Sequence, residues 1–401
     1  MASLIAACLT LFSLATADFQ EYPSAPTASS ADAKAGPLLT RWAADVNPAA
    51  PLPEHPRPQF QRDDWTSLNG QWDYAITEVG AERPQQWQGK ITVPFAVESQ
   101  LSGVSKRLSE KQLLWYRRDV VLPAAEDDSR ALLHFGAVDW KATVWIDDYK
   151  LGEHSGGYDA FSFSIPPKFL DGKSHQIFVR VWDPTDSGLQ PRGKQVKEPR
   201  GIWYTPVSGI WQSVWLEQVP AQHLKNLRLK GSYQKSILEL SVDVAGEAEG
   251  LRLHYQITPM QELHWHDGRP LLQNSKGQTG QPFHSSDGPP QLGSIGLRGN
   301  SFRDNIQIEA AMPWTPEHPN LYVLELELSR NGWPVDKVTS YFGMRDLAMQ
   351  KDNNGVQRLL LNREFIFQLG MLDQGYWPDG LYTAATDEAL CEDIIVAKNL
   401  G

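Results

Sequence analysis

The sequence is poor in cysteine, and its apolar runs are short. Its 401 residues include two cysteines, Cys8 and Cys391, and we expect the segment that holds Cys8 to be removed, which leaves no pair for an intrachain disulfide. The most apolar stretch, Leu4 to Leu14, is about half of the ~20 residues that a helix needs to span a bilayer. The sequence therefore predicts neither a disulfide framework nor a membrane-spanning helix.

Basic residues are also in deficit. The chain has 37 Lys and Arg against 48 Asp and Glu, a formal net charge of -11. Nucleic-acid affinity comes mostly from clustered cations that neutralise the phosphate backbone, so DNA and RNA are excluded as expected partners. The GxGxxG, P-loop and GxSxG patterns are missing as well, which argues against nucleotide binding and serine-hydrolase chemistry. No cofactor is predicted.

Aromatic residues, in contrast, are abundant. The chain contains 15 Trp and 12 Tyr but only 6 Met. Rigid flat side chains suit the cores of β-sandwiches, and they stack well on the C–H faces of sugars. Carbohydrate is therefore the ligand that the composition favours.

The N-terminal region has the features of a secretory signal followed by an extended arm. Ala15-Thr16-Ala17 follows the apolar stretch and fits small-residue cleavage specificity, although the first basic residue is Lys34. We expect residues 1–17 to be a signal peptide and the protein to be secreted. Residues 18–58 are rich in Ala, Pro and Ser, which predicts a tether or a wrapping arm without a core of its own.

Two regions of short alternating apolar segments follow. Residues 59–220 predict an all-β domain, and residues 221–346 predict a second, smaller sandwich of immunoglobulin type with a long polar insertion at 266–304. The expected strands of the first domain include residues 72–76, 116–122, 142–146, 176–182 and 212–217.

The last part of the chain has a different pattern. In residues 347–401 we expect a strand at Phe365 to Leu369, a Gly-rich loop, and a helix that begins near Thr386. This order is the opening unit of an α/β fold. Because one such unit has no partner strand, we expect it to expose its apolar side chains, namely Phe365, Phe367, Leu369, Ile394 and Leu400.

Four stretches, taken in order, resemble the amino-terminal half of glycoside hydrolase family 2, the group of β-galactosidases, β-glucuronidases and β-mannosidases. The first runs from Pro58 to Trp72 and includes Ser67-Leu68-Asn69-Gly70-Gln71-Trp72. The others are Val144 to Asp148 with Gly152 to Phe161, then Gly209 to Leu216, and last Pro313-Trp314 to Tyr322 with Phe342 to Arg345 and Leu361-Asn362-Arg363.

This resemblance implies a mainly β chain in three parts. They are a jelly-roll sugar-binding domain at 59–220, an immunoglobulin-like sandwich at 221–346, and the start of an incomplete (β/α)₈ barrel at 347–401. The two catalytic Glu of the family lie further along such a barrel, which needs ~250 residues, so no catalytic residue is assigned here. We expect a β-glycoside hydrolase that is inactive as this chain alone; the alternative is a non-catalytic, secreted carbohydrate-binding protein. A homo-oligomer is a further expectation from the family.

Four residues are candidate sugar contacts. Asp373 would follow the first barrel strand at the face where βα loops build active sites, with Tyr376 and Trp377 as a stacking wall. Asp183 begins an acidic loop that the family sends towards the active site. The alternatives are an Asp373 that only fixes a turn, aromatic residues that pack in a core, and a solvated loop at Asp183.

One histidine pair has a spacing that occurs in metal sites. His264 and His266 lie two residues apart, a spacing that holds Zn²⁺ only when a third ligand arrives. No third ligand is evident in the sequence, so no metal is predicted.

Overall fold

The computed structural model describes residues 38–124, 129–260, 264–266, 269–271 and 290–401. Within these ranges the chain is mainly β, with two short 3₁₀ helices, η1 (Arg41–Asp45) and η2 (Pro167–Phe169), and one α-helix, α1 (Asp387–Asn399). No helix of the described part is long and apolar enough to cross a membrane. The predicted signal segment, residues 1–17, lies outside the described residues.

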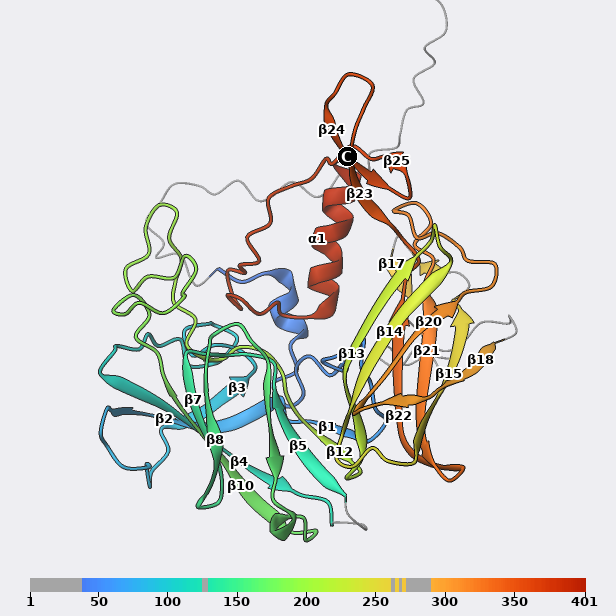
Figure 1. The fold of residues 1–401 in the computed structure, drawn as a ribbon. Helices are drawn as coiled ribbons and strands as arrows, with labels where there is room; N and C mark the ends of the chain where they lie inside the picture. Colours follow the sequence, from blue (N-terminus) through green and yellow to red (C-terminus); the bar gives the residue numbers. More distant parts are fainter. Residues whose placement is uncertain (1–37, 125–128, 261–263, 267–268, 272–289) are drawn as a thin grey trace, which may run out of the picture. The chain divides into compact units, whose positions relative to one another are not determined.

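The first β-sandwich is built from two sheets (Figure 1). Its strands are β1 (Trp65–Ser67), β2 (Gly70–Glu78), β3 (Gly89–Val93), β4 (Gln112–Val121), β5 (Arg130–Phe135), β6 (Val138–Asp139), β7 (Lys141–Ile146), β8 (Tyr149–Ser155), β9 (Phe161–Ile165), β10 (Ser174–Trp182), β11 (Gly209–Ile210) and β12 (Val214–Val219). One sheet has the order β1-β12-β5-β9 and the other β3-β2-β4-β10-β7-β8, while β6 pairs with β11. All five expected strand segments fall largely within strands of this sandwich.

The core of this sandwich follows from the period-two pattern. In β7, Ala142, Val144 and Ile146 are fully buried, and they pack in one cluster with residues of the opposite sheet such as Leu133 and Phe135. Burying a side chain as large as that of Val144 or Ile146 stabilises the fold by about 1.5–3 kcal/mol. Alternation along the strands therefore fixes which face of each sheet turns inward.

The second β-sandwich also has two sheets. Its strands are β13 (His223–Ser232), β14 (Ile237–Ala245), β15 (Leu251–Pro259), β18 (Gln291–Ile295), β19 (Leu297–Arg298), β20 (Ser301–Gln307), β21 (Tyr322–Arg330) and β22 (Trp333–Phe342), in the orders β13-β14-β20-β19 and β18-β15-β21-β22. A short separate pair, β16 (His264–His266) and β17 (Arg269–Leu271), lies between β15 and β18 in the sequence.

The insertion predicted at 266–304 extends too far at its C-terminal end. Residues 267–268 and 272–289 lie outside the described residues, but β18 and most of β20 fall inside the predicted range and pair with β15 and β14. Ile295 and Phe302 are buried in the core of the second sandwich. These two apolar side chains are enough to bring a polar, Gly-rich segment into the sheets.

The C-terminal part contains a three-stranded sheet and α1. Strands β23 (Leu347–Lys351), β24 (Gln357–Leu361) and β25 (Glu364–Phe365) pair in order. The strand expected at Phe365 to Leu369 was wrong beyond Phe365: the Ile366 amide still donates to the Leu359 carbonyl of β24 (3.4 Å), but residues 366–376 form no regular structure. The helix start was right: the Thr386 hydroxyl accepts a hydrogen bond from the Ala389 amide (3.2 Å) and caps α1.

Residues 38–58 wrap against the rest of the molecule. The amide and hydroxyl of Thr40 both donate to a carboxylate oxygen of Asp379, at 2.8 and 2.6 Å. The side-chain amide of Asn69 donates to the carbonyls of Pro51 and Leu52, both at 3.2 Å. These contacts hold this part of the predicted arm against the first sandwich and the segment before α1.

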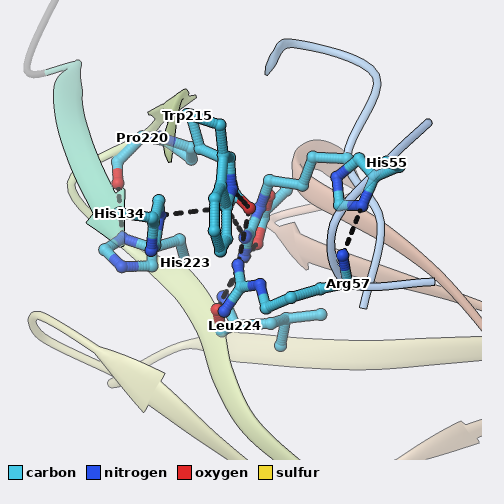
Figure 2. Close-up of polar contacts among 10 residues, drawn as sticks. His55, Arg57, His134, Trp215, Pro220, His223 and Leu224 are labelled. Atoms are coloured by element: carbon cyan, nitrogen blue, oxygen red, sulfur yellow. Dashed lines mark hydrogen bonds and ion pairs between the residues drawn. The ribbon is translucent and has the colours of Figure 1, made fainter. Parts of the chain in front are cut away.

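A buried ionic network joins the two sandwiches, and Figure 2 shows its surroundings, including the contacts of Arg57 with His55 and of His223 with Pro220. The Arg62 guanidinium donates to Glu217 of β12 (2.9 Å), to both carboxylate oxygens of Asp336 in β22 (3.0 Å each) and to the Leu224 carbonyl (2.6 Å). Arg57 adds a second contact to Glu217 at 2.5 Å. Burial acts to raise the pKa of Glu217, but the neighbouring cationic side chains outweigh it and lower this pKa to about 2.

Candidate functional site

Three buried carboxyl groups lie at the base of the loop formed by residues 183–208, which connects β10 to β11. Glu98, Asp139 and Asp183 are 8%, 3% and 2% exposed. They come from three separate segments: Glu98 follows β3, Asp139 ends β6, and Asp183 follows β10. We call these three residues the loop-base cluster.

The loop-base cluster holds the loop through specific hydrogen bonds. Asp183 accepts from the Thr185 amide (2.7 Å) and the Ser208 hydroxyl (2.6 Å). Glu98 accepts from the Ser208 amide at 2.9 Å, and Asp139 accepts from the side-chain amide of Gln195 at 2.9 Å. Both ends of the loop and its middle are therefore tied to buried carboxyl groups.

The pKa values of this cluster are shifted upward. Burial raises the pKa of Glu98 to about 8. Burial and the charge of Asp183 together raise the pKa of Asp139 to about 8, and burial also raises the pKa of Asp183. Removing a carboxylate from water without a paired cation favours the protonated form. Glu98 and Asp139 are thus weak acids that titrate well above the usual carboxyl range.

Five aromatic rings link the loop to the segment that precedes α1. Tyr376 packs against Tyr204 (ring centroids 4.5 Å apart) and against Tyr382 (5.5 Å). Tyr382 also lies near Trp211 (5.3 Å) and Tyr158 (6.1 Å). Flat faces and phenol hydroxyls of this kind recognise sugars. These five aromatic residues join the first sandwich to the segment before α1, where the predicted barrel begins.

The four residues predicted as sugar contacts are divided between the surface and the interior. Asp373 is exposed, and its carboxylate accepts from the Gly375 amide (2.7 Å), as the turn-fixing alternative requires. Tyr376 is half-buried and donates to the Thr205 carbonyl (2.6 Å), and Trp377 pairs with Leu381 through backbone hydrogen bonds. Asp183 is closed off at the base of the loop. The structure thus brings Tyr376 to the same loop as Asp183, and the sugar contacts of all four remain predictions.

A separate cavity lies between the wrapping segment and the start of α1. It has a volume of about 910 Å³, and its lining includes two indoles and five carboxyl groups. These are Trp42, Trp65, Asp45, Glu54, Asp63, Asp387 and Glu388. A cavity with aromatic walls and several carboxyl groups has the chemistry to bind a polyhydroxylated ligand.

The charge balance of this cavity is strongly acidic. Its one lining guanidinium, Arg62, is already bonded to Glu217 and Asp336. Burial, followed by the charge of Asp387, raises the pKa of Glu54 to about 7. Near neutral pH, Glu54 is therefore close to half-protonated and can donate or accept a hydrogen bond.

Sequence reasoning missed most of these residues. It named Asp183 but neither Glu98 nor Asp139, and it gave no role to Trp42 or Glu54. One signal was available for Glu98, which ends an apolar run from Val93 to Val97. An acid in such a run is either a strand end or a buried group, and here it is buried.

The described residues contain no group of three or more His, Cys, Asp or Glu side chains that could hold a metal ion. The side chains of His264 and His266 lie outside the described residues. The structure therefore does not test whether these two histidines bind a metal ion.

Comparisons with known proteins agree on one family. Residues 222–345 match the model of glycosyl hydrolases family 2. A putative beta-glucuronidase of Formosa agariphila is 25% identical over 236 residues, which is 58% of this chain and 25% of that protein. A beta-galactosidase of Bacteroides ovatus is 22% identical over 301 residues, which is 73% of this chain and 30% of that protein.

Solved structures give the same result for the fold. The beta-glucuronidase of Bacteroides uniformis aligns with a TM-score of 0.58 and 23% identity over 86% of this chain and 39% of that one. A beta-galacturonidase of Eisenbergiella tayi, bound to galacturonate, aligns with a TM-score of 0.59 and 18% identity over 85% and 53%. The chain thus spans a quarter to about half of the length of these similar proteins.

Proposed function

Because the chain belongs to glycoside hydrolase family 2, we propose that residues 59–401 form the accessory domains and the start of the barrel of an enzyme that hydrolyses O-glycosidic bonds of β-glycosides. The observation that carries this proposal is the family match in the second sandwich, together with the aromatic rings that join the first sandwich to the segment before α1. The substrate is a β-linked sugar, and its identity is left open.

The finer architecture is part of the same proposal. We assign the first sandwich, residues 59–220, to a jelly-roll sugar-binding domain and the second, residues 221–346, to an immunoglobulin-like domain. Residues 347–401 are then the start of a (β/α)₈ barrel. The sheet orders and the exposed apolar side chains of residues 365–372 support this assignment.

We propose that the 401-residue chain does not hydrolyse glycosides by itself. Retaining hydrolysis needs two carboxyl groups about 5–5.5 Å apart, both in contact with the sugar. The loop-base cluster has the raised pKa values of an acid catalyst, but its side chains are at most 8% exposed and bonded to the loop. No sugar can reach them while the loop is in place.

The assay is direct. The purified chain is incubated with 4-nitrophenyl β-glucuronide, β-galactoside and β-mannoside, and release of nitrophenol is followed against a mock-purified control. We expect no release above the control. Turnover that disappears in a Glu54→Gln variant would overturn the proposal and place the catalytic acid in the cavity.

The second candidate function is carbohydrate binding without catalysis, and the cavity favours it. Trp42 and Trp65 offer stacking faces, while Glu54 and Asp387 offer hydrogen-bond acceptors. Calorimetry with free uronic acids, galactose and mannose tests this function. Trp42→Ala should abolish the heat of binding, whereas Trp333→Ala, which changes an exposed indole outside the cavity, should leave it unchanged. Equal loss in both variants, or no heat with any sugar, would contradict a binding role for the cavity.

We further propose that the protein is secreted and forms homo-oligomers, as the N-terminal sequence and the family suggest. Expression with a reporter fused after residue 17 tests secretion, and sedimentation velocity tests the oligomeric state. A reporter retained in the cell, or a strictly monomeric profile, would count against each of these.

A further inference from the structure

The loop-base cluster serves no catalytic purpose in the proposed function, yet it places three carboxyl groups in one buried region. The cation that faces it is Lys197, which acts on Asp183. Lys197 is itself bonded to Glu110 and Ser187. The phenols that face the cluster are Tyr116, next to Glu98, Tyr376, next to Glu98, and Tyr382, next to Asp139; burial raises the pKa of each, so they add no charge.

The hydrogen bonds distinguish the three carboxyl groups of the cluster. Asp183 accepts two hydrogen bonds, one on each oxygen, and so is the best-solvated anion of the three. Glu98 accepts its bonds from Ser208 on one oxygen, and its other oxygen, Oε1, is buried with no partner among the described residues. Burying an unpaired charge costs far more than burying a neutral acid, so Glu98 and Asp139 are the members of the cluster that hold protons.

We propose that Glu98, Asp139 and Asp183 form a proton-dependent contact that holds the loop 183–208 closed against the segment before α1, and that the loop opens more readily as the pH rises. This inference concerns regulation of the proposed sugar site and rests on the proposed function only for its biological meaning.

The loop carries the contacts that would change on opening. Gln195, held by Asp139, donates to the Tyr158 hydroxyl (3.2 Å) and accepts from the Val207 amide (2.6 Å). On the same loop, Lys194 and Tyr204 both donate to the side-chain carbonyl of Gln374, at 2.9 and 2.8 Å. Opening would break the contacts to Tyr158 and Gln374 and separate Tyr204 from Tyr376.

The direction of the pH effect follows from proton linkage. In the closed loop Glu98 and Asp139 keep their protons up to about pH 8, whereas solvated carboxyl groups lose them near pH 4. The closed form therefore binds more protons than the open form between about pH 4 and pH 8, and closure weakens as the pH rises across that window. Each retained proton changes the opening equilibrium by up to about tenfold per pH unit.

Amide hydrogen exchange of the 401-residue chain tests this directly. The amide of Ser208 reports on the contact directly, because it donates to Glu98, and the amide of Val207 reports on it through Gln195, which Asp139 holds. After correction for intrinsic exchange, their protection should fall by at least several-fold for each pH unit between pH 5.5 and 8. Core amides of the second sandwich, such as Leu253 and Leu326, control for global unfolding.

Two variants and one control complete the test. Asp139→Asn and Glu98→Gln keep the size of the side chain but remove its titration, so each should reduce the pH slope by about the contribution of one proton. Glu198→Gln changes an exposed acid on the same loop and should leave the slope as in the parent chain. Protection that is independent of pH in the parent, or equal slopes in the parent and both cluster variants, would overturn the inference. No sugar or turnover is needed, so this result stands apart from the fate of the glycosidase proposal.

Discussion

The molecule buries carboxyl groups in two places, with opposite consequences. Between the two sandwiches, Glu217 and Asp336 lie against Arg62, and the pKa of Glu217 falls to about 2. At the base of the loop 183–208, Glu98 and Asp139 have no guanidinium partner, and their pKa values rise to about 8. Burial alone raises the pKa in both places. The direction of the net pKa shift is therefore decided by whether a cationic side chain is held next to the carboxyl group.

This difference in pKa matches the different structural roles of the two sites. The network around Arg62 joins segments that are 155 and 274 residues apart in the sequence, and Glu217 in it stays charged down to about pH 2. The loop-base cluster changes its protonation within that range. A paired buried charge makes a permanent joint between domains, whereas unpaired buried acids make a contact that depends on pH.

The largest expected effect comes from breaking the permanent joint. Arg62→Met removes the guanidinium that Glu217 and Asp336 share; Glu217 keeps Arg57, but buried Asp336 loses its paired cation, so the free energy of unfolding should fall by about 3–5 kcal/mol. Urea unfolding measures the loss. The control is Arg41→Ala, which breaks an ion pair with Glu392 whose arginine side chain is 61% exposed, and should cost less than about 1 kcal/mol. Similar losses in the two variants would show that burial does not distinguish these ion pairs.

The next largest effect is the decrease in the free energy of unfolding at acid pH. The folded pKa of Glu217 lies below its unfolded value of about 4.5, so its contribution is fully present above pH 4.5 and is lost as the pH falls towards 2. The contribution at neutral pH is about 3 kcal/mol from the size of the shift. Glu217→Gln should flatten the stability curve between pH 4.5 and 2. A variant curve parallel to that of the parent would remove Glu217 from the account of acid unfolding.

A smaller effect contrasts the sandwiches with the C-terminal segment. Phe367, Leu369 and Leu372 are 73%, 71% and 86% exposed, in line with the proposal that residues 347–401 begin a barrel. Replacing the three by Ser should reduce aggregation in light scattering, because exposed apolar patches promote association. The free energy of unfolding should change by less than about 0.5 kcal/mol for each substitution. Unchanged scattering would mean that this surface does not drive association.

The sequence predicted the strands well because their signal is local. Alternation with period two marks β2, β4, β7 and β10, and Thr386 marks the start of α1 through its side-chain chemistry. The strand expected after Phe365 failed for the opposite reason, because a strand needs a neighbour to accept its backbone hydrogen bonds. That neighbour is not encoded in the segment itself.

The candidate sites were harder to predict, for a related reason. Glu98, Asp139 and Asp183 are brought together by the pairing of distant strands, and no local pattern records that meeting. The cavity likewise depends on Glu54 and Asp387, which are far apart in the sequence and share a wall only after folding. Asp183 is predicted as a sugar contact because its loop resembles a family pattern, and in the structure it is buried and bonded to Ser208.

The claim that a fixed cation decides the behaviour of these buried acids is tested most directly by the stability difference between Asp139→Asn and the parent chain, measured by urea unfolding from pH 4 to pH 9. The folded pKa of Asp139 is raised, so the parent loses stability relative to the variant as the pH rises from about 4 to about 8. The account predicts a difference that grows in favour of the variant across this window and is constant above it. A difference that is flat with pH, or that grows in favour of the parent, would contradict it.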